Sequence, residues 1–116
     1  MPTTHIMVVE DEQLTALLLR SVLEHRGFRV TCAFNGAEAL EHFAADPADL
    51  VVTDLKMPGM SGYDLIVALR RVSARVPIIV ATGIVEHGAF QPNDIKVLHK
   101  PIDPGELLRT VAQLVS

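Results

Sequence analysis

The sequence of 116 residues contains a single cysteine, Cys32. An internal disulfide is therefore excluded, and such sparse use of cysteine fits a reducing compartment. Long apolar runs are also missing, since no segment approaches the roughly 18 apolar residues that a membrane-spanning helix requires. The amino terminus, MPTTHIMVVE, lacks the basic start and the apolar stretch of a secretory signal peptide. We therefore expect a cytoplasmic protein without a membrane partner.

Positive charge is scarce as well. Ten basic residues stand against fourteen acidic ones, the formal net charge is −4, and no Lys/Arg run occurs. This balance argues against a nucleic-acid-binding surface. Repeats, linkers and low-complexity segments are absent, and the length fits one domain. We expect a single domain over residues 1–116 with no output domain, and Met1 followed by a short lead favours a stand-alone protein.

Short apolar runs supply the first positive signal. They cover residues 6–9, 50–52, 78–81 and 95–98, and a fifth segment, 28–34, alternates apolar and other side chains. The first three runs are typical of strands buried on both faces, as in a parallel sheet. The alternating segment suits a strand nearer the edge of that sheet.

Helical patterns lie between these strands. Leu14, Leu17, Leu18 and Val22 form the apolar face of a first helix, which Gly27 ends. Capping boxes at residues 35–38 and 103–106 open two further helices, the second with proline at its first position. The remaining apolar stripes are Ala37, Leu40, Phe43 and Ala44; Leu65, Ile66, Leu69 and Val72; and Leu107, Leu108, Val111, Leu114 and Val115.

Strand and helix thus alternate five times, which predicts an α/β layered domain with a parallel sheet. One crossover, residues 83–94, has only twelve residues. A crossover including its helix needs at least about 10–12 residues. The fourth helix is therefore expected to be a turn or two at most, or irregular.

Polar residues follow the ends of the predicted strands. They are Glu10 and Asp11 after the first, Asp54 after the third, Thr82 after the fourth and Lys100 after the fifth. Ligands of open α/β folds bind at this carboxyl edge of the sheet, so we expect these side chains to gather there.

The chemistry of the cluster is specific. Three neighbouring carboxylates repel, which should raise at least one pKa. Hard oxygen ligands suit Mg²⁺, and an aspartate can act as a covalent nucleophile toward a phosphoryl group. Lys100 and the hydroxyl of Thr82 could neutralise or bind the other phosphoryl oxygens. The set is complete for making and holding an aspartyl phosphate.

Four motifs carry a resemblance to a known family. VVEDE (8–12), VVTDLKMPGMSG (51–62), PIIVATG (77–83) and LHKPID (98–103) occur in the order found in receiver domains of two-component response regulators. The chain resembles that family over nearly its whole length. The resemblance implies a flavodoxin-like (βα)5 three-layer sandwich with sheet order 2-1-3-4-5.

Residue roles follow from this resemblance. Asp54 is implied as the phosphoacceptor, with Thr82 and Lys100 contacting the phosphoryl group. Asp11, Asp54 and the backbone carbonyl of Lys56 are implied as direct Mg²⁺ ligands, and Glu10 as a ligand through water. The bond between Lys100 and the following proline is often cis in the family.

The chain also departs from the family pattern. Val97 occupies the position where the family usually has an aromatic switch residue, and Thr82 and Lys100 are only 18 positions apart. These features resemble a divergent single-domain subgroup with a reduced fourth helix, often linked to kinases of the HWE type. Our hypothesis is that phosphorylation orders the 83–94 loop instead of turning an aromatic switch.

The function implied is signal transduction. A sensor histidine kinase or a histidine phosphotransfer protein would phosphorylate Asp54, and a downstream protein target would bind the first helix or the face around the fifth strand. The chain would not be an enzyme beyond its own phosphotransfer and autodephosphorylation.

Three alternatives remain. A degenerate receiver would bind partners without phosphorylation, although all five site residues are present. A Mg²⁺-dependent phosphatase of the haloacid-dehalogenase type needs Asp-x-Asp, but position 56 is lysine, so the general acid is missing. A nucleotide-binding protein is disfavoured because no glycine-rich phosphate loop follows the first strand.

Overall fold

A computed structural model describes residues 3–83 and 95–115. Five parallel strands form one sheet in the order β2-β1-β3-β4-β5, which confirms the flavodoxin-like order predicted from the sequence. The strands are β1 (His5–Val9), β2 (Arg29–Ala33), β3 (Leu50–Asp54), β4 (Ile78–Thr82) and β5 (Ile95–His99). The described helices are α1 (Gln13–His25), α2 (Gly36–Ala45), α3 (Gly62–Val72) and α4 (Pro104–Val115).

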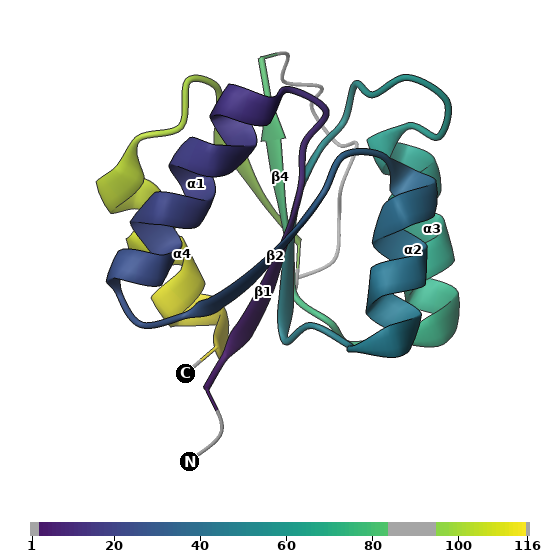
Figure 1. Ribbon diagram of the computed structural model, residues 1–116, viewed down its shortest axis with the longest axis horizontal. Coiled ribbons are helices and arrows are strands. Elements are labelled where there is room, and N and C mark those ends of the chain that lie inside the picture. Colours follow the sequence, from purple (N-terminus) through teal and green to yellow (C-terminus); the bar gives the residue numbers. More distant parts are fainter. Residues whose placement is uncertain (1–2, 84–94, 116) are drawn as a thin grey trace.

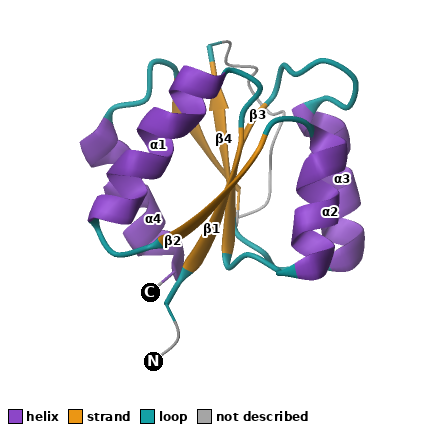
Figure 2. Ribbon diagram, viewed as in Figure 1, coloured by secondary structure: helices purple, strands orange, loops and turns teal. Residues whose placement is uncertain are grey.

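The helices form two layers around the sheet. Figure 1 shows α1 and α4 on one face and α2 and α3 on the other, and Figure 2 separates the central strands from both layers. Each face has its own apolar cluster, one built on Leu19, Leu23 and Leu107, the other on Phe43 and Leu69. Every residue of β1 and β4 is buried, as predicted for strands covered on both faces. The three-layer sandwich is confirmed.

In each predicted capping box, the hydrogen bond from the backbone of the third helical residue to the N-cap side chain is present. Asn35 accepts a hydrogen bond from the backbone N–H of Glu38 at 2.8 Å, and Asp103 accepts one from Glu106 at 2.9 Å. Pro104 is the first residue of α4, where its missing N–H costs nothing. These caps fix where α2 and α4 begin, beside the carboxyl edge of the sheet.

The predicted apolar face of α1 is wrong for three of its four residues, and only Val22 packs against the core. Leu14, Leu17 and Leu18 are 78%, 55% and 61% exposed, while the buried residues of the helix are Ala16, Leu19 and Leu23. Leucines occupy both sides of α1, so either row satisfies helical spacing. The side that packs on the sheet carries Ala16, and the carbonyl oxygen of Ala16 lies 4.0 Å from the Sγ of Cys32 on β2.

A smaller error concerns α3, whose last residue, Val72, is 68% exposed instead of completing the apolar stripe. The predicted short fourth helix and the proposed ordering of residues 83–94 fall on the segment 84–94, which lies outside the described residues. Among the described helices, none is long and apolar enough to cross a membrane.

Candidate functional site

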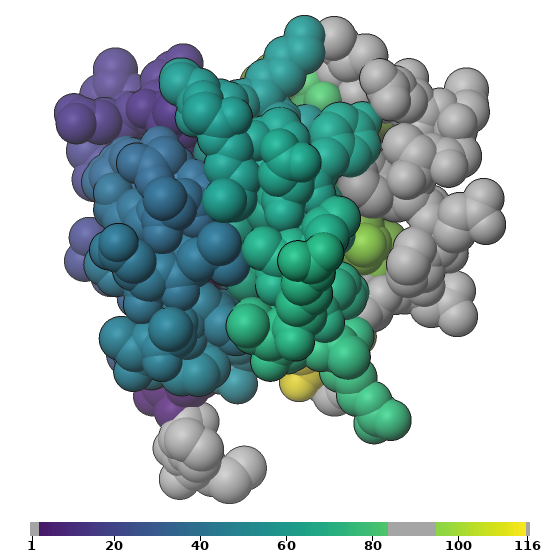
Figure 3. All heavy atoms as spheres, turned by 90° about the vertical axis from the view of Figure 1, so that its right-hand side faces the viewer, coloured from purple at the N-terminus to yellow at the C-terminus, as the bar shows by residue number. Residues whose placement is uncertain are grey.

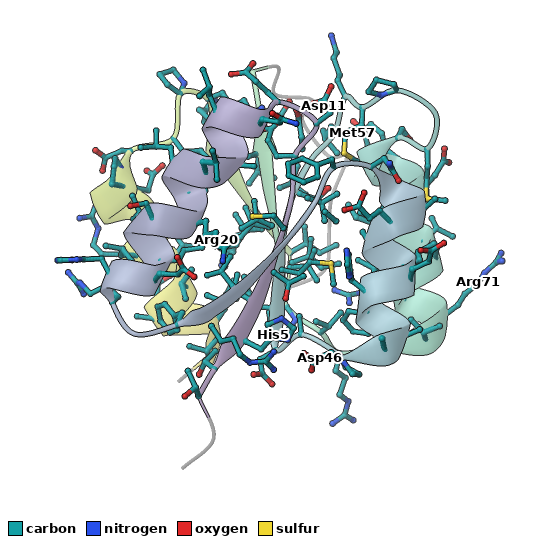
Figure 4. All side chains as sticks on the ribbon, in the orientation of Figure 1. His5, Asp11, Arg20, Asp46, Met57 and Arg71 are labelled. Atoms are coloured by element: carbon teal, nitrogen blue, oxygen red, sulfur yellow. The ribbon has the colours of Figure 1, made fainter. Side chains whose placement is uncertain are left out.

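Neighbouring strands bring the three acidic residues together. In the register of β1 and β3, Val9 lies opposite Thr53, so Glu10 and Asp11 follow one strand where Asp54 ends the next. One carboxylate oxygen from each acid lies within 4.8 Å of the other two. Figure 4 shows Asp11 at the carboxyl ends of the strands, where the sequence predicted this cluster.

Lys100 lies between two of these carboxylates. Its Nζ donates to Glu10 Oε1 at 2.7 Å and to Asp54 Oδ2 at 2.9 Å. The backbone N–H of Lys100 donates to the carbonyl of Thr82 at 2.9 Å, and the bond to Pro101 is cis, as the resemblance implied. Residues 90 positions apart in sequence therefore share one hydrogen-bonded site.

Burial sets the electrostatics of the site. The side chain of Glu10 is only 4% exposed, and this burial raises its pKa, with a further contribution from the charge of Asp54 and opposition from Lys100. For Lys100, burial acts to lower the pKa, but its hydrogen bonds to Glu10 and Asp54 outweigh that effect and raise it. The predicted rise of a carboxyl pKa is confirmed, but desolvation is a larger cause than repulsion.

The other predicted residues lie at the same edge. Thr82 is buried at the end of β4, one residue after Ala81, which pairs with Asp54 across the sheet. The backbone N–H of Lys56 donates to Asp54 Oδ1 at 3.3 Å. Both oxygens of Asp54 therefore have a donor from the chain. The roles of Thr82 as a phosphoryl contact and of the Lys56 carbonyl as a ligand stay predictions.

The close packing of Gly62 against the end of β3 was not predicted from the sequence. A Cβ at this position would lie 2.6 Å from the Cα of Leu55 and would also collide with the carbonyl of Asp54. The N–H of Gly62 donates to the carbonyl of Leu55 at 2.9 Å. Only the closing glycine of the MPGMSG segment signals this contact in the sequence. It fixes the N-terminus of α3 against the residue that follows β3.

The donor set fits a hard divalent cation. Glu10, Asp11 and Asp54 offer only carboxylate oxygens, which Mg²⁺ prefers, and Asp11 is exposed, so the cluster is open to solvent on its side. The ammonium of Lys100 offsets part of the clustered negative charge. The residues present can therefore hold Mg²⁺ and leave space for a further oxygen ligand.

Two proteins are similar to this chain in amino-acid sequence. The uncharacterised transcriptional regulatory protein YkoG of Bacillus subtilis is 38% identical over 79 residues, which cover 68% of this chain and 35% of YkoG. The response regulator SaeR of Staphylococcus aureus is 29% identical over 117 residues, which cover 97% of this chain and 51% of SaeR. The chain thus spans about half or less of the length of these relatives.

Solved structures agree with the sequence comparison. Chemotaxis protein CheY4 of Vibrio cholerae matches with a TM-score of 0.91 and 25% identity, covering 97% of this chain and 99% of CheY4. A response regulator receiver protein from Sinorhizobium medicae matches with a TM-score of 0.87 and 29% identity, covering 97% of this chain and 94% of its own. A family model described as the response regulator receiver domain covers residues 6–112. The chain therefore belongs to the family of response regulator receiver domains.

Proposed function

We propose that Asp54 accepts a phosphoryl group from the phosphohistidine of a sensor histidine kinase or a histidine phosphotransfer protein. The signal then passes by contact with a downstream protein target. The observation that best supports this proposal is the position of Lys100, hydrogen-bonded to both Glu10 and Asp54 beside the carboxylate of Asp11. An ammonium held next to a nucleophilic carboxylate suits a reaction that brings extra negative charge to that carboxylate.

The chemistry divides among named groups. A carboxylate oxygen of Asp54 attacks phosphorus and the P–N bond to the donor imidazole breaks. The imidazole keeps the proton on its other ring nitrogen and leaves as a neutral group. The ammonium of Lys100 pairs with one oxygen of the transferred phosphoryl group, and the hydroxyl of Thr82 donates to another. Mg²⁺ held directly by Asp11, Asp54 and the Lys56 carbonyl, and by Glu10 through water, would supply charge neutralisation. Water later attacks phosphorus, which releases inorganic phosphate and restores the carboxylate.

The phosphodonor would dock on α1. Leu14, Leu17 and Leu18 form an exposed apolar surface, which we call the α1 leucine patch. A groove beside this patch is lined by Thr15, Leu18, Lys100, Pro101 and Ile102. It leads from the patch to the site, so a donor seated on apolar contacts would bring its phosphohistidine toward Asp54.

Further parts of the proposal concern the whole chain. We propose that residues 1–116 act as one receiver domain in the cytoplasm, with a protein target as the output partner and without nucleic acid or membrane. A formal net charge of −4 supports a protein target, because it provides no basic excess for phosphate backbones. Self-catalysed phosphotransfer and dephosphorylation, not turnover of an external substrate, make up the activity.

Phosphotransfer profiling tests this function. A panel of autophosphorylated, radiolabelled histidine kinases is mixed with the protein and with its Asp54→Asn variant. We expect rapid transfer from one or a few kinases to the wild type and none to the variant. Transfer that persists in Asp54→Asn would reject Asp54 as acceptor. A phosphatase would instead release phosphate from many sugar phosphates over many turnovers.

A further inference from the structure

A second groove lies on the opposite face, between α2 and α3. Figure 3 looks onto this face, with the two helices side by side. Leu40, Phe43 and Ala44 line the groove from α2, and Ala68, Arg71 and Val72 line it from α3. Its volume is about 430 Å³. The site around Asp54 uses none of these six residues.

The groove is predominantly apolar and partly uncovered. Val72 is 68% exposed, although valine is among the residues most often buried. Ala44 and Ala68 are small, so an incoming backbone can come close between the larger side chains of Leu40 and Val72. A hydrophobic groove of this kind is a surface into which an amphipathic helix can lay its apolar face.

A guanidinium group lies at the edge of this apolar surface. Figure 4 shows Arg71 extending from α3 away from the body of the protein. No carboxylate within residues 3–83 and 95–115 pairs with Arg71. The adjacent Arg70 differs, because it donates to the carbonyls of Ser73 and Val76 at 3.4 and 2.7 Å. Glu41, the exposed acid of α2, does not line the groove.

We infer that the groove between α2 and α3 binds an amphipathic helix of a partner protein. Apolar side chains of that helix pack on Phe43 and Val72, and a flanking carboxylate pairs with Arg71. Charge complementarity selects an acidic helix over a basic one. The inference goes beyond phosphotransfer, because α1 and α4 lie on the other face of the sheet and the groove does not require a phosphorylated Asp54.

Selection from a peptide library tests this inference. The probe is a displayed library of helical peptides of about 14 residues, or four turns, with randomised apolar, acidic and basic positions. It is selected against the full-length protein. Enriched peptides are synthesised, labelled and titrated by fluorescence anisotropy. We expect them to carry apolar residues three and four positions apart beside an acidic residue.

Matched variants locate the binding surface. Val72→Asp and Arg71→Glu are each expected to weaken binding about tenfold or more, the scale of losing a central contact. Val67→Asp is the control, because Val67 is 55% exposed on the same helix but does not line the groove. We expect less than about a twofold change for this control and for Leu14→Asp on the α1 leucine patch, since surface contacts outside an interface contribute little.

A charge exchange gives the sharpest readout. A selected peptide with its acidic residue replaced by lysine should bind the wild type weakly and recover affinity for Arg71→Glu. Asp54→Asn should bind the original peptide like the wild type, so failure of phosphotransfer does not affect this result. The inference is overturned if no peptide is enriched, or if enriched peptides bind Val72→Asp as tightly as the wild type. Loss of peptide binding in Leu14→Asp would also overturn it. So would sedimentation showing that copies of the protein occupy the groove.

Discussion

Gly62 packs directly against the backbone that carries Asp54. A Cβ at position 62 would lie 2.6 Å from the Cα of Leu55, a separation that real Cβ atoms essentially never show. Because the obstructing atoms belong to the backbone, no side-chain rotation can relieve the contact. The first turn of α3 is therefore held against the end of β3, and the position of Asp54 depends on a residue eight places further along the chain.

The Gly62→Ala variant should lose stability and phosphorylation together. We expect a loss of about 1–3 kcal/mol, the usual cost of overpacking, because the backbone of residues 54 and 55 must shift. Urea unfolding and the rate of phosphorylation by acetyl phosphate measure the two effects. Gly105→Ala is the control, since its Cβ would meet only the side-chain ends of Arg109 and Asp103. Equal behaviour of the two variants would contradict this role for Gly62.

Replacing Lys100 should change Mg²⁺ affinity and the rate of phosphorylation in opposite directions. In Lys100→Ala the ammonium no longer offsets the charges of Glu10 and Asp54, so the unphosphorylated variant should bind Mg²⁺ more tightly than the wild type. Phosphorylation should nevertheless slow, because the charge on the transferred group loses its partner. Isothermal titration with Mg²⁺ and a phosphorylation time course measure these opposite changes.

The same variant should depend on the metal for stability. Without Mg²⁺, we expect about 1.5–3 kcal/mol lower unfolding free energy, the scale of a lost hydrogen bond to a charged group. Saturating Mg²⁺ should restore more stability to Lys100→Ala than to the wild type. Weaker Mg²⁺ binding by the variant would show that Lys100 organises the carboxylates more than it competes with the metal.

The α1 leucine patch should matter for the donor and not for the fold. Leu14→Asp and Leu17→Asp are expected to slow transfer from a cognate kinase at least about tenfold, the loss expected for central interface contacts. Both should keep wild-type stability and react normally with acetyl phosphate. Leu23→Ala is the matched contrast, because Leu23 is fully buried and its truncation should cost about 2–5 kcal/mol. Normal kinase transfer to both aspartate variants would contradict docking on the patch.

Low pH should break the ion pair between Asp46 and Arg29, the first residue of β2. Arg29 donates to both oxygens of Asp46, at 2.5 and 3.2 Å, and these hydrogen bonds lower the pKa of Asp46 below its ordinary value of 3.8. A depressed carboxyl pKa stabilises the fold above the unfolded-state pKa, and this contribution disappears as pH falls through the folded-state pKa.

The stability deficit of Arg29→Gln should therefore be constant from neutral pH down to the ordinary pKa of Asp46 and should shrink below it. High salt should reduce the deficit at neutral pH, because both side chains are about half exposed. Urea unfolding at a series of pH values measures it. Arg75→Gln is the control, since no ion pair joins Arg75 to any described residue. A deficit that persists unchanged at low pH would exclude this ion pair as its cause.

The gathering of polar site residues at the carboxyl ends of the strands was the most predictable feature of the protein. Asp54, Thr82 and Lys100 each follow an apolar run, and parallel strands place such positions at one edge. The sheet order came from the family resemblance, and the observed pairing confirms it. The hydrogen bonds of Lys100 to Glu10 and Asp54 follow from the same logic, because a cation and carboxylates at one edge pair when they are near.

Helix orientation was harder to predict, for a physical reason. Periodicity identifies α1 as a helix, but leucines on both of its sides do not determine which side is buried, and only the packing of the helix against the sheet reveals it. Tertiary contacts also decide the close approach of Gly62 to Leu55, which leaves no periodic trace in the sequence. The surface between α2 and α3 depends on how two separate helices align, so it could be recognised only in the structure.

Intact-mass spectrometry after incubation with acetyl phosphate and Mg²⁺ tests the central claim most directly. The wild type should gain the mass of one phosphoryl group, and chelation of Mg²⁺ should prevent the gain. The Asp54→Asn variant should gain nothing under the same conditions. An unmodified wild type, or an equal gain in Asp54→Asn, would contradict the assignment of Asp54 as the phosphoacceptor.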